Sequence, residues 1–189
     1  MKFNRHSEYE GKHALLSASN YYWLADDDEA LLERLAKANA AAHGTREHAF
    51  AAEAIRLGHK LENNTMTVNY YINECIGYRM EPEVLLFYTP YAFGTADAIS
   101  FRQEADGRFV LRIFDLKTGT SKASFRQLIA YAALFCHEYG VKPMTIDYDL
   151  RIFQNDDMHM YECDPEEVAE VYDRYESANQ LLIKNNKEV

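Results

Sequence analysis

The stretch that decides the fold is "GTADAISFRQEADGRFVLRIFDLKTGTSKASFRQLIAYAALF", residues 94 to 135. Residues 92–103 and 107–118 are rich in β-branched and aromatic residues, and the polar segment "EADGR" joins them. This pattern predicts a β-hairpin. The segment that follows, residues 124–140, has a helical pattern that begins near Ser124 and ends at Gly140. A hairpin followed by a helix is therefore the centre of the expected fold.

The loop of this hairpin decides which side chains face each other. A two-residue turn at Asp106-Gly107 would place Asp97 and Asp115 on opposite faces of the sheet. A three-residue loop, residues 105–107, puts Gly107 at the position that needs a left-handed backbone. The second register is our prediction. In this register three pairs of residues lie opposite each other across the hairpin: Asp97 and Asp115, Ile99 and Ile113, and Phe101 and Leu111.

The two opposed aspartates predict a metal site at one end of an otherwise apolar face. Asp97, Asp115 and the backbone carbonyl of Leu116 offer only oxygen ligands, which suit Mg²⁺ or Mn²⁺. Lys117 projects from the same face as Asp115, roughly 6–7 Å further along the strand. A cation there would activate a water and neutralise phosphoryl charge, while Lys117 would hold water and phosphate. The alternative to a metal site is that these are polar residues at the ends of strands, with Asp115 and Lys117 a surface ion pair worth ~1 kcal/mol or less.

The rest of the chain predicts an α+β domain. Three helices are expected first, over residues 26–44, 45–58 and 65–80, and Thr45 is the expected N-cap of the second. The Val, Tyr and Ile content of the third also fits a strand. A strand over 83–89 precedes the hairpin. A strand pair over 143–154 and 159–163 and a helix that begins at Asp164-Pro165 follow the central helix.

This order corresponds to a central mixed β-sheet with an αβββαβ core, flanked by helices and preceded by a helical N-terminal region. We expect a single domain over residues 1–189. Its parts are a helical section to about residue 80, a catalytic sheet core over about 83–163 and a C-terminal helix over about 165–184.

Composition narrows the possible function. The chain has 189 residues, and 48% of them are hydrophobic, so disorder is not expected. Its net charge of −10 argues against a large nonspecific DNA footprint. It contains no apolar run near ~18 residues and no signal-peptide core, so we expect a cytoplasmic protein without a membrane partner. Cys75, Cys136 and Cys163 are widely spaced and odd in number, which predicts buried free thiols.

Taken in order, these motifs resemble the RecB-like branch of the PD-(D/E)XK nuclease superfamily, which includes AddB-like and phage-type exonucleases. The matching words are "GTAD" with Asp97, "DLK" with Asp115 and Lys117, and "QLIAY" with Gln127 and Tyr131. The family often carries "GTxxH" on an earlier helix, and "GTREH" here supplies His48. The opening "LLSASNYYWL", residues 15–24, is similar to that of several members. The resemblance covers roughly residues 13 to 150.

The resemblance implies a restriction-endonuclease-like fold and a deoxyribonuclease that hydrolyses phosphodiester bonds with Mg²⁺ or Mn²⁺. Such enzymes are most often exonucleases that act in recombination, repair or phage DNA processing. It implies DNA ends or single strands as partners and a recombination or replication protein as a further partner. The short chain also fits a virus-encoded or mobile-element origin, which the sequence does not establish. The oligomeric state stays open. Some members hold an iron–sulfur cluster with four cysteines, and the three cysteines here predict none.

The resemblance also assigns roles to individual residues. The expected catalytic residues are Asp97, Asp115, Lys117, Gln127 and Tyr131, and the expected metal ligands are His48, Asp97, Asp115 and Leu116. The loop "TGTSKAS" would offer Thr118, Ser121 and Lys122 to a substrate phosphate near a helix N-terminus. It is not a Walker A loop, because the first glycine is missing.

Two other functions stay open. A catalytically silent module of the same fold would bind DNA ends or a partner protein, which the charge of −10 favours. An enzyme that acts on RNA would differ only in its substrate.

Overall fold

The computed structural model describes residues 24–119 and 124–185. The chain divides into two units, residues 1–45 and 46–189, and each is described by itself. Whether the whole chain is one domain stays a prediction. Among the described residues, no helix is long and apolar enough to cross a membrane.

The first long helix corrects one prediction. Helix α1 runs over Asp28–Leu57 and does not stop at Gly44. The expected N-cap, Thr45, instead donates its hydroxyl hydrogen bond to the carbonyl of Ala41, one turn earlier in the same helix, at 3.0 Å. The expected start is confirmed, because Asp27 Oδ1 accepts a hydrogen bond from the N–H of Ala30 at 2.9 Å. A single glycine costs a helix only about 1 kcal/mol, and the alanine-rich sequence around it favours continuation.

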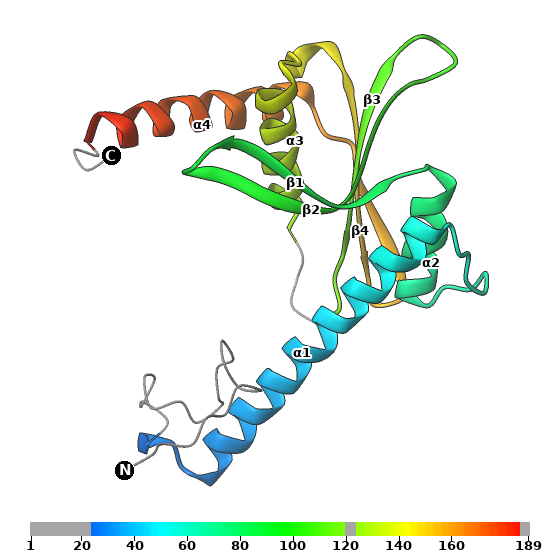
Figure 1. The fold of residues 1–189 in the computed structure, drawn as a ribbon, viewed down its shortest axis with the longest axis vertical. Coiled ribbons are helices and arrows are strands. Elements are labelled where there is room, and N and C mark those ends of the chain that lie inside the picture. Colours follow the sequence, from blue (N-terminus) through cyan, green and yellow to red (C-terminus); the bar gives the residue numbers. More distant parts are fainter. Residues whose placement is uncertain (1–23, 120–123, 186–189) are drawn as a thin grey trace, which may run out of the picture. The chain divides into compact units, whose positions relative to one another are not determined.

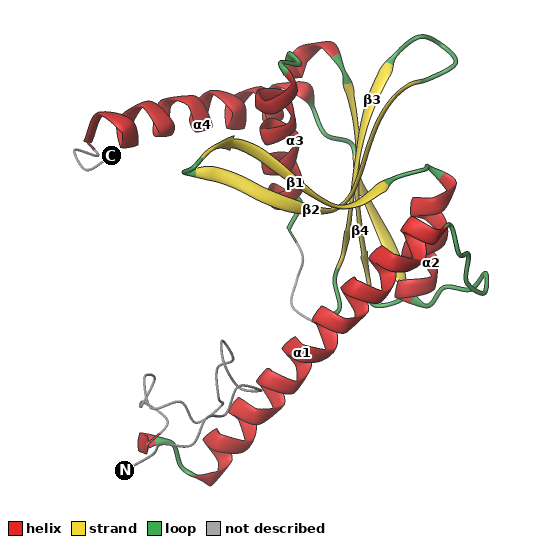
Figure 2. Ribbon diagram, in the orientation of Figure 1, coloured by secondary structure: helices red, strands yellow, loops and turns green. Residues whose placement is uncertain are grey.

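The 46–189 unit is built on one five-stranded sheet, shown in Figures 1 and 2. Its strands lie in chain order: β1 Glu81–Thr89, β2 Ala92–Gln103, β3 Phe109–Leu116, β4 Asp147–Gln154 and β5 Asp157–Tyr161. All neighbours are antiparallel except β3 and β4, which are parallel and are connected through α3, Arg126–Tyr139. The predicted α+β class with a mixed sheet flanked by helices is confirmed at this level.

The register of the central hairpin is the predicted one. Ile99 pairs with Ile113 and Phe101 pairs with Leu111. The loop has three residues, and Gly107 takes a left-handed φ of 90°. The last ladder pair on the other side is Ala98 with Phe114, so the next step along the two strands brings Asp97 opposite Asp115.

Two hydrophobic cores hold the sheet between layers of helices. The first joins α3 to one face of the sheet and includes Leu111 and Ile113 of β3. The second joins the last turns of α1 and helix α2, Thr67–Gly77, to the other face and includes Phe114 and Leu116. β3 is thus buried on both faces, which explains its nearly continuous apolar sequence.

The remaining elements are of the predicted types, but their bounds differ: β1 begins two residues earlier than expected, and the strand expected from residue 143 begins at Asp147. The segment 65–80 forms helix α2 and not a strand. Helix α4, Pro165–Asn185, begins with proline in its first turn as predicted. The β4–β5 hairpin turns through two residues, Asn155 and Asp156, both at positive φ, so β5 begins two residues earlier than expected. A short 3₁₀ helix, Pro143–Thr145, leads into β4.

Candidate functional site

Three carboxylates lie in a row across three neighbouring strands. Glu83 of β1 lies opposite Asp97 of β2, because the ladder pairs on either side of them are Pro82 with Ala98 and Val84 with Ala96. Asp115 of β3 is the next group in this row. Sheet pairing therefore brings acids from three separate strands to one place.

At Asp97, the alternation of β2 side chains between the two hydrophobic cores is interrupted. Ala96 belongs to the core beneath α3, whereas Ala98, only two residues later, belongs to the core beneath α1 and α2. In a regular strand these two side chains would share one face. The carboxylate of Asp97 consequently stands at the boundary between layers. It accepts a 2.9 Å hydrogen bond from the N–H of Leu116, and its Oδ2 lies 3.5 Å from Nδ1 of His48 on α1.

Asp115 is the most buried acid of the site. Its side chain is only 3% exposed, and Lys117 Nζ lies 3.0 Å from Oδ1 and 2.9 Å from Oδ2. Only Oδ1 meets the lysine with hydrogen-bond geometry, and Oδ2 takes no hydrogen bond from the described part of the chain. Burial and the charge of Asp97 raise the pKa of Asp115, while Lys117 acts in the opposite direction. A cation near Oδ2 would relieve this cost.

Lys117 begins a chain of hydrogen bonds that ends on α3. Its ammonium donates to Oε1 of Gln127 at 3.0 Å, and Nε2 of Gln127 donates to the hydroxyl of Tyr131 at 3.0 Å. Gln127 and Tyr131 are four residues apart and therefore share one helix face. The four polar side chains that drew attention in the sequence, from Asp115 to Tyr131, form one connected network.

Tyr131 can lie in this position because the residue of β2 beneath its ring is Gly94, which has no side chain. A Cβ atom added at Gly94 would lie 2.9 Å from Cε1 of Tyr131, which is closer than real contacts of this kind allow. Gly94 thus lets the tyrosine ring lie directly against the strand. This explains the glycine of the "GTAD" word in terms of packing.

His48 is part of the same cluster. The hydrogen bond with Asp97 is the main reason that its pKa is raised, and burial acts against this shift. His48 is 29% exposed at its side chain, so part of the imidazole is accessible. The ligand atoms of His48, Glu83 and Asp97 all lie within 4.8 Å of one another, a spacing that could hold a cation.

Glu83 is a site residue that sequence reasoning missed. It has a φ of 54°, which is rare for a residue with a side chain and costs on the order of 1–3 kcal/mol. Burial and the charge of Asp97 raise its pKa. A strained residue beside a carboxylate of like charge is typical of a functional site. No motif signals it, because only the β1–β2 pairing places it opposite Asp97.

The other expected site residues are placed as follows. Leu116 is buried at the end of β3, and its N–H is used by Asp97; a role for its carbonyl as a ligand stays a prediction. Thr118 is exposed and lines a pocket beside Lys117. Ser121 and Lys122 lie outside the described residues, as do residues 15–23 of the N-terminal motif. The three cysteines are buried and free, which confirms that expectation.

The donor set fits a hard divalent cation. The cluster offers carboxylate oxygens from two strands, on Glu83 and Asp97, and one imidazole nitrogen, on His48. Asp115, an expected ligand, lies outside this cluster and contacts Lys117; its role as a ligand stays a prediction. A comparison of the chain with protein-family models, curated protein sequences and solved structures finds no match.

Proposed function

We propose that the chain is a Mg²⁺- or Mn²⁺-dependent DNA nuclease with a restriction-endonuclease-like fold, of the RecB-like kind. We further propose that it acts as an exonuclease. The observation that carries the proposal is the connected network from Asp115 through Lys117 and Gln127 to Tyr131, beside the cluster of His48 and Asp97. A strand-end ion pair alone would not need a glutamine and a tyrosine aligned behind the lysine.

Each group has a chemical role in phosphodiester hydrolysis. His48, Asp97 and Asp115 would hold the cation, with Glu83 beside them, and the bound cation supplies charge neutralisation for the phosphate. Lys117 would bind a phosphate oxygen and the attacking water, since its ammonium is already aimed into the site by Gln127. Tyr131, held by Gln127, would contact the nucleic-acid backbone.

The test follows cleavage of end-labelled DNA. Linear and closed-circular DNA, single- and double-stranded, are incubated with the wild type in Mg²⁺, in Mn²⁺ and with a chelator. The matched variants are Lys117→Ala and Lys60→Ala, which removes an exposed lysine elsewhere. Loss of linear DNA with the wild type and Lys60→Ala, but not with Lys117→Ala or chelator, supports the proposal. Sparing of the circles would identify an exonuclease.

The net charge of −10 favours a second candidate, a module of the same fold that binds DNA ends or a partner protein without cleaving. Such a module has no need of a cation, so its DNA or partner affinity should be the same in Mn²⁺ and in chelator. Asp115→Ala should leave that affinity unchanged. A protein that binds DNA in this way and cleaves neither DNA nor RNA would decide for this candidate.

A further inference from the structure

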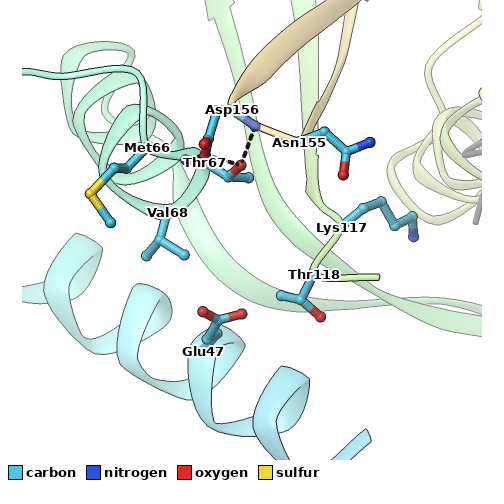
Figure 3. A pocket seen from close by; sticks show the side chains of 8 residues that line it. All are labelled: Glu47, Met66, Thr67, Val68, Lys117, Thr118, Asn155 and Asp156. Atoms are coloured by element: carbon cyan, nitrogen blue, oxygen red, sulfur yellow. Dashed lines mark hydrogen bonds between the residues drawn. The ribbon is translucent and has the colours of Figure 1, made fainter. Parts of the chain in front are cut away.

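A pocket of about 230 Å³ adjoins the candidate site within the 46–189 unit (Figure 3). Its walls come from the second half of α1, the first turn of α2, the end of β3 and the β4–β5 turn. Figure 3 shows the side chains of Glu47, Val68 and Thr118 directed toward the space between these segments. The proposed chemistry uses Lys117 of this lining and leaves most of the pocket without a role.

The pocket and the candidate site share one wall. Lys117 lines the pocket with its stem, while its ammonium lies at Asp115 and Gln127. On α1, Glu47 of the pocket directly precedes His48 of the cluster. A phosphate held by Lys117 would therefore lie next to a residue that also lines the pocket.

The charges of the pocket disfavour a second phosphate. Among the described residues of the lining, Glu47 and Asp156 are acidic, and Lys117, whose ammonium lies at Asp115 and Gln127, is the one basic residue. The N–H at the start of α2 gives no anion site, because the Thr67 N–H donates to Asp156 Oδ1 at 2.8 Å. A second cation is also disfavoured, because the one metal-type cluster found among the described residues is that of His48.

The lining suits a nucleobase instead. Met66 and Val68 offer apolar surface to a flat ring, and Met66 is 60% exposed, so its contact surface is open. The carboxylates and the Thr118 hydroxyl can accept hydrogen bonds from an exocyclic amine. The volume is smaller than that of drug-sized ligand sites, so it admits one ring system and not a base pair.

We propose that this pocket binds one unpaired nucleobase, that of the nucleotide next to the phosphate at Lys117, and prefers bases with an exocyclic amine. The inference rests on the proposed nuclease function and extends it to the substrate, which must be single-stranded or frayed at that nucleotide. It also assigns a role to the first turn of α2, which the phosphate chemistry leaves without one.

The test separates this pocket from catalysis by using free nucleosides, which contain no phosphate. The methyl groups of the six methionines are labelled with ¹³C, and the signals of Met66 and Met144 are assigned through Met66→Leu and Met144→Leu. Met144 is 58% exposed and lies outside the pocket, so it is a matched internal control. Deoxyadenosine, deoxycytidine and deoxyguanosine should shift the Met66 signal at lower concentration than thymidine does, and should leave Met144 unchanged.

A second measurement uses Met66→Ala, which removes apolar surface from the lining, beside Met144→Ala. Loss of this contact with the base should raise the KM for a single-stranded oligonucleotide about tenfold while kcat changes much less, and Met144→Ala should behave as the wild type. The proposal is overturned if no nucleoside shifts Met66, even when the protein cleaves DNA. An equal response to thymidine overturns the preference for amines. Nucleoside binding by a protein that cleaves nothing would instead reject the nuclease function and retain the pocket.

Discussion

The carboxylate of Asp97, on β2, accepts a hydrogen bond of 2.9 Å from the backbone N–H of Leu116, on β3. Leu116 lies between Asp115 and Lys117, so this bond ties one expected ligand to the short segment that carries the other ligand and the lysine. The geometry of the site therefore depends on the pairing of β2 with β3, and the three-residue loop at Gly107 sets that pairing.

The first prediction concerns the coupling of Lys117 and Gln127. Lys117→Ala should reduce cleavage by about a hundredfold or more, because it removes the ammonium group that would contact the phosphate. Gln127→Ala should reduce it less, because the lysine keeps its contact with Asp115. In the double variant Gln127→Ala should add little, since the glutamine acts through the lysine. Steady-state rates of the four proteins give the coupling, and Gln180→Ala on the exposed face of α4 is the control. Strictly multiplicative losses would mean that the two residues act separately.

The second prediction is that Asp115→Asn stabilises the protein when no divalent cation is present. Burial and Asp97 raise the pKa of Asp115, so its ionised form at neutral pH lowers the free energy of unfolding. The neutral isostere should increase that free energy by about 1 kcal/mol in urea melts. Because the pKa is raised in the folded state, the cost is absent below the unfolded pKa near 3.8 and appears as the pH rises. The difference between variant and wild type should therefore shrink in acid.

Asp173→Asn, on an exposed turn of α4, should change stability little and is the control. Mn²⁺ should raise the melting temperature of the wild type and not that of Asp115→Asn, by mass action on the folded state. A less stable Asp115→Asn protein at neutral pH without metal would show that the Lys117 ion pair outweighs burial.

Gly94 gives a third prediction. Gly94→Ala should displace the ring of Tyr131, at a cost of about 1–3 kcal/mol in stability, and should weaken its hydrogen bond with Gln127. Gly77→Ala, where an added Cβ meets nothing within 4 Å, should be nearly neutral. If the clash is the cause, Gly94→Ala should cost less in a Tyr131→Ala background. An equal cost in both backgrounds would place the effect in the strand itself.

Much of this arrangement was predictable, for identifiable reasons. The Gly107 loop sets the β2–β3 register from sequence, and the helical spacing of Gln127 and Tyr131 places them on one face. Glu83 was not predictable, because its position depends on a positive φ and on the β1–β2 register, which no loop residue specifies. The expected break at Gly44 is wrong because helix propensity over many alanines outweighs one glycine.

The buried thiols give a fourth prediction. Burial raises the pKa of Cys163 to about 12 from an ordinary value of 9.0, and it raises the pKa values of Cys75 and Cys136 as well. All three should react slowly with a thiol reagent in the native protein and rapidly in denaturant. Between pH 9 and 12 the unfolded thiol of Cys163 ionises before the folded one, so stability should fall as the pH rises.

Urea melts of the wild type and of Cys163→Ala at pH 8 and pH 10 measure how much of this loss of stability comes from Cys163. The variant should lose less stability between the two pH values, because it lacks the Cys163 thiol that ionises in the unfolded chain. A rapid native reaction of Cys163 with the reagent would contradict the burial on which the prediction rests.

The measurement that tests the central claim most directly is the cleavage rate of end-labelled linear DNA in Mn²⁺ by the wild type and by Asp97→Asn. The asparagine oxygen can still accept the bond from the Leu116 N–H, so the fold should be kept while the charge that faces His48 is lost. We predict cleavage by the wild type and a rate at least about a hundredfold lower for the variant. Equal rates for the two proteins, or no cleavage by a folded wild type, would contradict a nuclease site at Asp97.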